Sequence, residues 1–98
     1  MFDKMKALME AQRKMQEMKQ ELEDTVFDVL SSDGLVKIKM NGAQETKEIS
    51  IQDDLAKVDK TILEKAVKDA YNRAIKRCQE IAAGKMKDIT GFNIPGLF

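Results

Sequence analysis

The 98-residue sequence contains no His, no Trp, one Cys and one Pro, and each shortage excludes a class of chemistry. Without His there is no Ser-His-Asp triad, no imidazole base at neutral pH and no imidazole metal ligand. The single Cys78 cannot form an intramolecular disulfide or a thiolate zinc site, which fits a reducing compartment. These shortages exclude much of the enzyme repertoire. We predict a protein that is not an enzyme, with no catalytic residues, no metal and no cofactor, and an enzyme that relies on Cys78 or on Asp53-Asp54 is the third hypothesis.

Long apolar runs are also missing, and no stretch approaches the roughly 20 residues that are needed to span a bilayer. The first six residues, MFDKMK, carry charges where a signal peptide needs an apolar core. The five glycines are scattered, so no phosphate-binding loop is present. We expect a cytoplasmic protein with no membrane partner and no small-molecule substrate.

Helix-forming residues, by contrast, are abundant in the first quarter of the chain. Residues 3–24 include no Gly or Pro, which predicts a helix at least roughly 30 Å long. Every third or fourth position gives a stripe that is mostly apolar: Met1, Met5, Leu8, Ala11 or Gln12, Met15, Met18 and Leu22. We interpret this stripe as a surface that packs against a partner helix, with a Met-rich binding groove as the alternative.

The middle of the chain has the pattern of β-strands. Residues 25–31 are rich in β-branched and apolar side chains, and residues 35–40 and 45–51 alternate apolar with polar side chains. Asn41-Gly42 predicts a tight type I′ turn between the last two strands, because both residues tolerate a positive φ. These segments predict a three-stranded antiparallel meander with one face in water.

A second long helix is predicted from about Lys60, with Asp59 as its N-cap, to about Ala83, where Gly84 caps or weakens it. Cys78 lies on its apolar face and is interpreted as a small buried side chain rather than a nucleophile. Residues 1–87 then form a single domain. Residues 88–98, with two Gly and the only Pro, form a C-terminal tail that is flexible or docked on a neighbour.

The charges are segregated although 17 basic and 17 acidic side chains cancel. Residues 1–59 have a net charge of −4 and residues 60–98 a net charge of +4. If the two helices pack as antiparallel arms, their free ends, residues 1–14 and 73–87, meet in a tip with a net charge of +6.

This tip is our candidate DNA-binding site, because binding to phosphates requires local positive charge. The alternative is a solvated helix face with an incidental bias. The candidate residues are Lys4, Lys6, Arg13, Lys14, Arg73, Lys76, Arg77, Lys85 and Lys87.

Several ordered features resemble one protein family over nearly the whole chain. They are the Met- and Gln-rich first helix, residues 34–42 (GLVKIKMNG), residues 49–51, the Ala66, Ala70 and Ala74 helix ending in Lys85-Met86, and Gly91 with Pro95-Gly96-Leu97. Together these features resemble the YbaB/EbfC family of bacterial nucleoid-associated proteins. The resemblance implies an α+β fold of order α-β-β-β-α and a homodimer joined through its sheets, with two long helices as projecting arms. It also implies binding of double-stranded DNA in the nucleoid.

Our leading hypothesis is a nucleoid-associated homodimer that grips duplex DNA through the basic tips of its helical arms, with a role in gene regulation or nucleoid organisation. The alternative is a protein-interaction or chaperone-like module that uses the Met-rich helix and the apolar tail to hold another protein.

Overall fold

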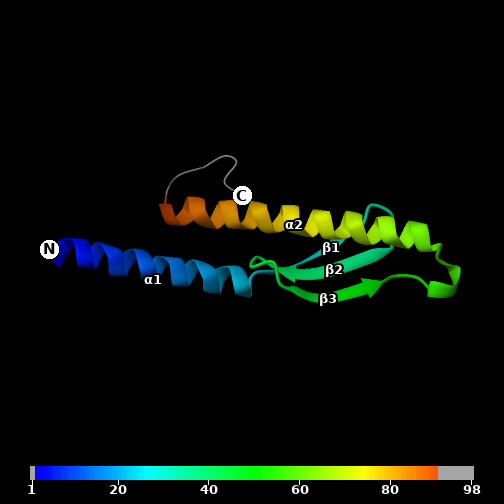
Figure 1. Ribbon diagram of the computed structural model, residues 1–98, viewed down its shortest axis with the longest axis horizontal. Helices are drawn as coiled ribbons and strands as arrows, with labels where there is room; N and C mark the ends of the chain where they lie inside the picture. Colours follow the sequence, from blue (N-terminus) through cyan, green and yellow to red (C-terminus); the bar gives the residue numbers. More distant parts are fainter. Residues whose placement is uncertain (1, 91–98) are drawn as a thin grey trace.

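The fold is given by a computed structural model that describes residues 2–90. Its elements are α1 (Phe2–Asp24), β1 (Val26–Leu30), β2 (Val36–Asn41), β3 (Thr46–Ile51), the short 3-10 helix η1 (Leu55–Lys57) and α2 (Lys60–Thr90). This order confirms the predicted α-β-β-β-α subunit of the α+β class. The molecule is elongated, with extents of 67, 24 and 16 Å, because α1 points away from the sheet (Figure 1).

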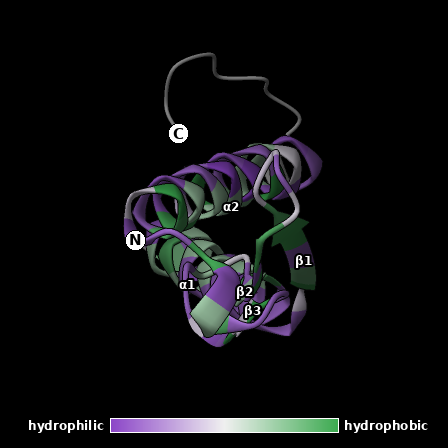
Figure 2. Cartoon of the chain, turned by 90° about the vertical axis from the view of Figure 1, so that its right-hand side faces the viewer, coloured by the Kyte–Doolittle hydropathy of each residue, from purple (hydrophilic) through white to green (hydrophobic). Residues whose placement is uncertain are grey.

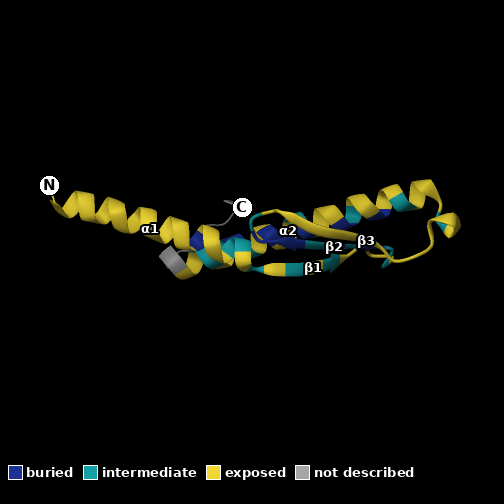
Figure 3. Ribbon diagram, turned by 90° about the horizontal axis from the view of Figure 1, so that it is seen from below, coloured by how far each residue is buried: buried dark blue, intermediate teal, exposed yellow. Residues whose placement is uncertain are grey.

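The three strands form one antiparallel sheet in the order β1-β2-β3. Val36, Ile38 and Met40 of the central strand β2 are completely buried. Helix α2 covers this side of the sheet and contacts β2 and β1 (Figure 3). Lys37 and Lys39, which alternate with the buried residues, lie on the opposite and open face, so the predicted alternation is confirmed.

Helix α2 meets the sheet through a row of small residues spaced four apart: Ala66, Ala70, Ala74, Cys78 and Ala82, each no more than 8% exposed. Small side chains let the helix approach the sheet closely, so the larger side chains of β2 fill the core. The Cys78 sulfur lies 3.4 Å from the Met40 sulfur, and burial raises the pKa of the Cys78 thiol. This confirms that Cys78 is a buried core residue.

The loop between β2 and β3 anchors the end of α1 through the buried side chain of Asn41. Its amide nitrogen donates to the Glu23 carbonyl oxygen at 3.1 Å and to the Glu45 carboxylate at 2.7 Å. Its amide oxygen accepts from the backbone N–H groups of Ala43 at 3.1 Å and Glu45 at 2.9 Å. One buried side chain therefore joins the last turn of α1 to the hairpin, with every polar atom bonded.

The predicted type I′ turn at Asn41-Gly42 is wrong, because these two residues serve this anchor instead. Neither has a positive φ, and the left-handed residue of the loop is Gln44 with φ 64°. The Gly42 N–H donates to the carbonyl oxygens of Leu22 and Thr25, each at 2.9 Å. A Cβ at position 42 would lie 3.0 Å from the Leu22 carbonyl oxygen, so a side chain there would force the end of α1 to move by a few tenths of an ångström.

Acidic residues cap both helical segments that follow the sheet. Asp54 accepts from the Ala56 N–H at 3.0 Å and caps η1, and Asp59 accepts from the Thr61 N–H at 2.8 Å and caps α2. A carboxylate at this position satisfies N–H groups that have no partner within the helix. The predicted N-cap of the second long helix is thus confirmed.

The C-terminal boundary of α2 differs from the prediction. The helix continues through Gly84 to Thr90 instead of ending near Ala83. Open space surrounds Gly84, so this residue weakens the helix without terminating it. Residues 88–90, assigned to the tail from the sequence, are helical, while residues 91–98, and with them the predicted flexibility or docking, lie outside the described residues.

We expect Gly42→Ala to lower the free energy of unfolding by about 1–3 kcal/mol, because the added methyl group comes into too tight a contact with the Leu22 carbonyl. The matched control Gly84→Ala adds the same group to a helix in open space and should raise the free energy of unfolding by up to about 1 kcal/mol. Urea unfolding of both variants at one protein concentration measures the difference. If both substitutions changed the free energy of unfolding in the same direction, the close contact of Gly42 with the end of α1 would be contradicted.

Candidate nucleic-acid interface

The first half of α1 projects beyond the rest of the molecule as a single helix (Figure 1). Residues 2–17, named the arm here, are all exposed. Burial begins at Met18, which is 7% exposed, and Leu22 is half-buried where α1 meets α2 and the hairpin. The predicted packing of the apolar stripe against a partner helix therefore holds only for the base of α1.

Helix α2 runs antiparallel to α1 but does not reach its free end. The Lys85 ammonium lies 3.6 Å from the Glu21 carboxylate, which places the C-terminal part of α2 level with the second half of α1. At about 1.5 Å per residue, Lys4 lies about 25 Å farther out and Arg73 about 18 Å back over the sheet. The predicted meeting of residues 1–14 with residues 73–87 in one +6 tip is wrong.

The anchor at the hairpin explains this offset between the helices. Gly42 lies against both Leu22 and Ile81, so the end of α1 is held opposite a point two thirds of the way along α2. The first twenty or so residues of α2 cover the sheet and cannot extend alongside the arm. Two separate basic regions result, one on the arm and one on α2.

The arm carries Lys4, Lys6, Arg13 and Lys14, all exposed. Arg13 donates to the carboxylates of Glu10 and Glu17, and its pKa is raised first by the hydrogen bond to Glu10 and then by the charges of both. Among residues 2–90, no carboxylate lies within ion-pair distance of the three arm lysines. Lysine charge on the arm is therefore available to an anionic partner.

The five candidate residues of α2 also divide into residues with a carboxylate partner and residues without one. Three of them form ion pairs: Arg73–Asp69 at 3.1 Å, Arg77–Glu80 at 3.3 Å and Lys85–Glu21 at 3.6 Å. Lys76 and Lys87 are exposed, and within the described part of the chain neither has a carboxylate at ion-pair distance. These two lysines are the strongest candidates on α2 for contact with phosphates.

Lys65 and Lys68 extend the basic region of α2, although the sequence-based set of site residues omits them. Both are exposed. At about 100° per residue they share one side of the helix with Arg73, Lys76 and Lys87, and we name these five residues the α2 basic face. Hydrophilic residues occupy the outer side of α2, away from the sheet (Figure 2). The sequence already contains the signal that identifies both lysines, because they lie on the side of the helix opposite its apolar residues.

Asp69 fixes the orientation of α2 relative to the sheet. Its carboxylate accepts from the Ser32 backbone N–H at 2.7 Å and from the Ser32 hydroxyl at 2.9 Å, and it also pairs with Arg73. The pKa of Asp69 is lowered, mainly by the two bonds from Ser32 and less by Arg73. Asp69 thus joins the helix to the β1–β2 turn and holds one guanidinium of the α2 basic face.

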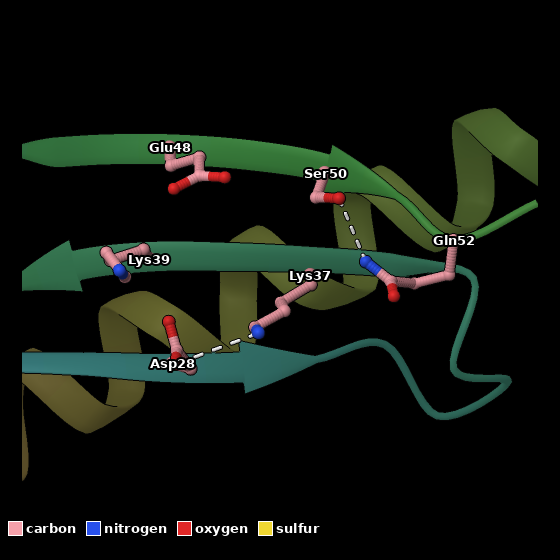
Figure 4. A pocket seen from close by; sticks show the side chains of 6 residues that line it. All are labelled: Asp28, Lys37, Lys39, Glu48, Ser50 and Gln52. Carbon is pink, nitrogen blue, oxygen red and sulfur yellow. Dashed lines mark hydrogen bonds and ion pairs between the residues drawn. The ribbon is translucent and has the colours of Figure 1, made fainter.

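The open face of the sheet is a mixed-charge surface rather than a basic one. Its shallow hollow of about 280 Å³ is lined by Asp28, Lys37, Lys39, Glu48, Ser50 and Gln52 (Figure 4). Lys37 lies 4.0 Å from Asp28, and the two lysines are balanced by two carboxylates. This face offers little net attraction to a polyanion.

Residues 2–90 contain no cluster of three His, Cys, Asp or Glu side chains that could hold a metal ion. Over the same residues, neither long helix combines the length and apolar character needed to cross a membrane.

A family model described as the YbaB/EbfC DNA-binding family matches residues 1–92. A nucleoid-associated protein of Clostridium novyi is 35% identical over 96 residues, which cover 96% of this chain and 84% of that protein. A nucleoid-associated protein of Dictyoglomus turgidum is 36% identical over 100 aligned positions, covering 99% and 96% of the two chains. The crystal structure of an uncharacterized Helicobacter pylori protein matches with a TM-score of 0.76 at 21% identity, over 91% of this chain and 96% of that one. This last likeness concerns the fold alone.

We expect Asp69→Asn to reduce stability at pH 7, because a neutral amide accepts the Ser32 and Arg73 bonds more weakly. Since the folded-state pKa of Asp69 is lowered, its contribution is fully present above about pH 4 and is lost as the pH falls through the lowered pKa. The loss in the variant should therefore shrink between pH 7 and pH 2. Urea unfolding at both pH values measures this loss of stability, and Asp88→Asn on the same helix is the control. An equal loss of stability at pH 7 and pH 2 would contradict the stabilising role of the Asp69 carboxylate.

Proposed function

Because this chain belongs to the YbaB/EbfC DNA-binding family, we propose that it is a nucleoid-associated protein that binds double-stranded DNA. Relatives that it matches over most of their length bear the name nucleoid-associated protein. The family is a DNA-binding family and not an enzyme family. The observation that carries the proposal is the α2 basic face, an exposed row of cations without an equal number of carboxylates on the same side.

In this proposal the protein binds the phosphate backbone and not the base edges. The α2 basic face runs from Lys65 to Lys87, a length of about 33 Å, close to the roughly 34 Å of one turn of B-DNA. A row of that length can follow the backbone across one groove. Contacts of lysine ammonium groups with phosphates position a protein on DNA but carry no sequence information.

The proposed DNA contacts include the nine basic residues predicted from the sequence. Lysines without a carboxylate partner in the described structure supply charge directly. The paired residues Arg13, Arg73, Arg77 and Lys85 contribute by exchanging a carboxylate for a phosphate. The full set is Lys4, Lys6, Arg13, Lys14, Arg73, Lys76, Arg77, Lys85 and Lys87, joined by Lys65 and Lys68.

The acidic residues at the base of α1 constrain the path of the DNA. Glu21, Glu23 and Asp24 lie at the base of α1, where Glu21 is paired with Lys85 of α2. A duplex laid across this run would meet repulsion, so it lies along α2 and meets the arm farther out. Because the net charge of the chain is zero, long-range attraction is weak and binding depends on these local cations.

We further propose that two copies associate through an apolar patch beside the edge strand β3. Ile49 and Ile51 pair in register with Ile38 and Val36, so they point to the side of the sheet that α2 covers. They are nevertheless 56% and 38% exposed, because α2 lies over β2 and β1. The edge of β3 thus presents bare isoleucines next to the core.

Helix α2 extends this patch on the same side. Val67 and Tyr71 are 38% and 49% exposed and lie one turn apart. Helical spacing of about 100° per residue puts them opposite Asp69, whose contact with Ser32 marks the β1 side of α2. They therefore face the β3 side. A second copy that covers the four apolar side chains would leave the α2 basic face open.

We expect the double variant Lys76→Glu/Lys87→Glu to bind a generic duplex at least about tenfold more weakly, with a reduced dependence of affinity on salt. The measurement is fluorescence anisotropy at two or more salt concentrations. The control Lys47→Glu/Lys57→Glu makes the same change of charge on β3 and η1 and should have a small effect. Absence of binding by the parent protein at low salt, or equal weakening in the control, would contradict the proposal.

We expect the chain to be a dimer by light scattering at micromolar concentration and Ile49→Glu/Tyr71→Glu to be a monomer, because both charges fall in the apolar patch. Leu30→Glu is the matched control, since Leu30 is 49% exposed on the open face of the sheet. Circular dichroism establishes that each variant is folded. A monomeric parent, or a folded dimer in the double variant, would refute this interface.

A further inference from the structure

A seven-residue pattern separates the charged side chains of the arm from the apolar ones. With Met5 at position a of a heptad, positions b, c and f of residues 2–17 carry a charge everywhere except at Ala7. Positions a, d, e and g carry a single charge, that of Lys4. The residues at these four positions, named the arm seam here, are Phe2, Lys4, Met5, Leu8, Met9, Ala11, Gln12, Met15 and Gln16.

The large apolar side chains of the arm seam are uncovered within residues 2–90. The exposed fractions are 86% for Phe2, 62% for Met5, 61% for Leu8, 66% for Met9 and 63% for Met15. Isolated exposed apolar residues are ordinary, but five on four turns of one side of a helix form a continuous apolar surface. Such a surface is typical of a helix that packs against another helix.

The arm seam continues a surface that is covered at the base of α1. Leu8, Met15 and Leu22 follow each other at position d, seven residues apart. Leu22 is half-buried where α1 meets α2 and the hairpin. Helix α2 ends level with about residue 16 of α1, because Lys85 lies beside Glu21 in the antiparallel pair. The surface that α2 helps to cover at the base therefore extends along the arm beyond the end of α2.

The scarcity of charge on the arm seam indicates what kind of partner covers it. A nucleic acid or an anionic membrane needs several cations beside the apolar side chains, and the arm seam offers only Lys4. An apolar helix with a heptad pattern does not need them, because its side chains pack into the spaces between those of its partner. The arm of a second copy is such a helix, with the same length and the same pattern.

We propose that the arms of two copies pair through their arm seams as a short antiparallel coiled coil. Paired helix axes lie about 8–10 Å apart. The molecule measures 24 by 16 Å across its shorter extents, so a parallel pair would force the two sheets and their α2 helices into the same space. An antiparallel pair places them at opposite ends.

The heptad positions also define the register of this pair. In antiparallel coiled coils, position a of one helix faces position d of the other. With the two-fold axis level with residue 10, Met5 faces Met15 of the second copy and Leu8 faces Gln12. The cations Lys6 and Lys14, at positions b and c, stay on the outer side and remain accessible to phosphates.

The arm contact is weaker than a full coiled coil. Two heptads are fewer than the roughly three or four that an independent coiled coil needs. We therefore expect the arms to pair at higher protein concentration than the dimer formed through the patch beside β3. The contact needs no DNA and uses no residue of that patch, so its failure and the failure of DNA binding are distinguishable.

Mixed disulfides test the partner and the register together. Leu8→Cys and Gln12→Cys chains are mixed in equal amounts in a glutathione redox buffer without DNA, and the disulfide-linked species are separated by mass. A mixture of Glu10→Cys with Gln12→Cys is the control, because position 10 lies on the outer side of the arm. Cys78 is buried and does not interfere.

The mixed Leu8–Gln12 disulfide should be about tenfold more abundant than either disulfide between identical chains, against a statistical excess of about twofold in the control. An excess of disulfides between identical chains would overturn the proposal, because it indicates parallel arms. The statistical ratio in both mixtures would overturn it as well.

Removing the polar residue from the centre of the arm seam provides a second test. Gln12→Leu should strengthen association of the arms by about tenfold in a sedimentation series without DNA, because a polar side chain at position a weakens a coiled coil. Leu8→Gln/Met15→Gln should abolish it. The control Gln20→Leu adds the same side chain at position b and should have no effect. Equal strengthening by Gln12→Leu and Gln20→Leu would overturn the proposal.

Discussion

The buried hydrogen bonds of Asn41 and Gly42 are the constraint on which the rest of the molecule depends. They join the last carbonyl groups of α1 to the β2–β3 loop, where a helix end would otherwise need water or another cap. Because Gly42 also lies against Ile81, the same point sets the register between α1 and α2. The length of α1 beyond this point has no covering element among the described residues, and it becomes the arm.

The narrow contact between α2 and the sheet has a second consequence. A row of alanines and one cysteine brings the helix close to β2 and β1, and β3 is left with exposed isoleucines. One long helix therefore separates two surfaces of different character. An apolar patch lies on its β3 side, and cations occupy the side that faces away from the sheet. Geometry of this kind allows association through one surface while the other stays open to an anionic partner.

The distribution of charge is more informative than its total. A net charge of zero would count against a polyanionic partner, yet the lysines without carboxylate neighbours lie on the arm and on the outer side of α2. Carboxylates gather instead at the base of α1 and within the hollow of the sheet. Ion pairs such as Arg13 with Glu10 and Glu17 reduce the charge available at several arginines, so lysines carry most of it.

The amino-acid sequence by itself determined the elements of this protein, because helix propensity, strand alternation and the Asp59 cap act over a few residues. It also determined which side of α2 is polar, and the ordered motifs identified the family. The type I′ turn and the joint basic tip were predicted wrongly, since each depends on contacts between distant segments. The end of α2 at Ala83 was also predicted wrongly, because Gly84 weakens the helix without terminating it. Only the tertiary structure decided that Asn41 and Gly42 bind the end of α1 and that Lys85 meets Glu21. A hydrogen bond that spans eighteen residues, or an ion pair that spans sixty-four, leaves no local signal in the chain.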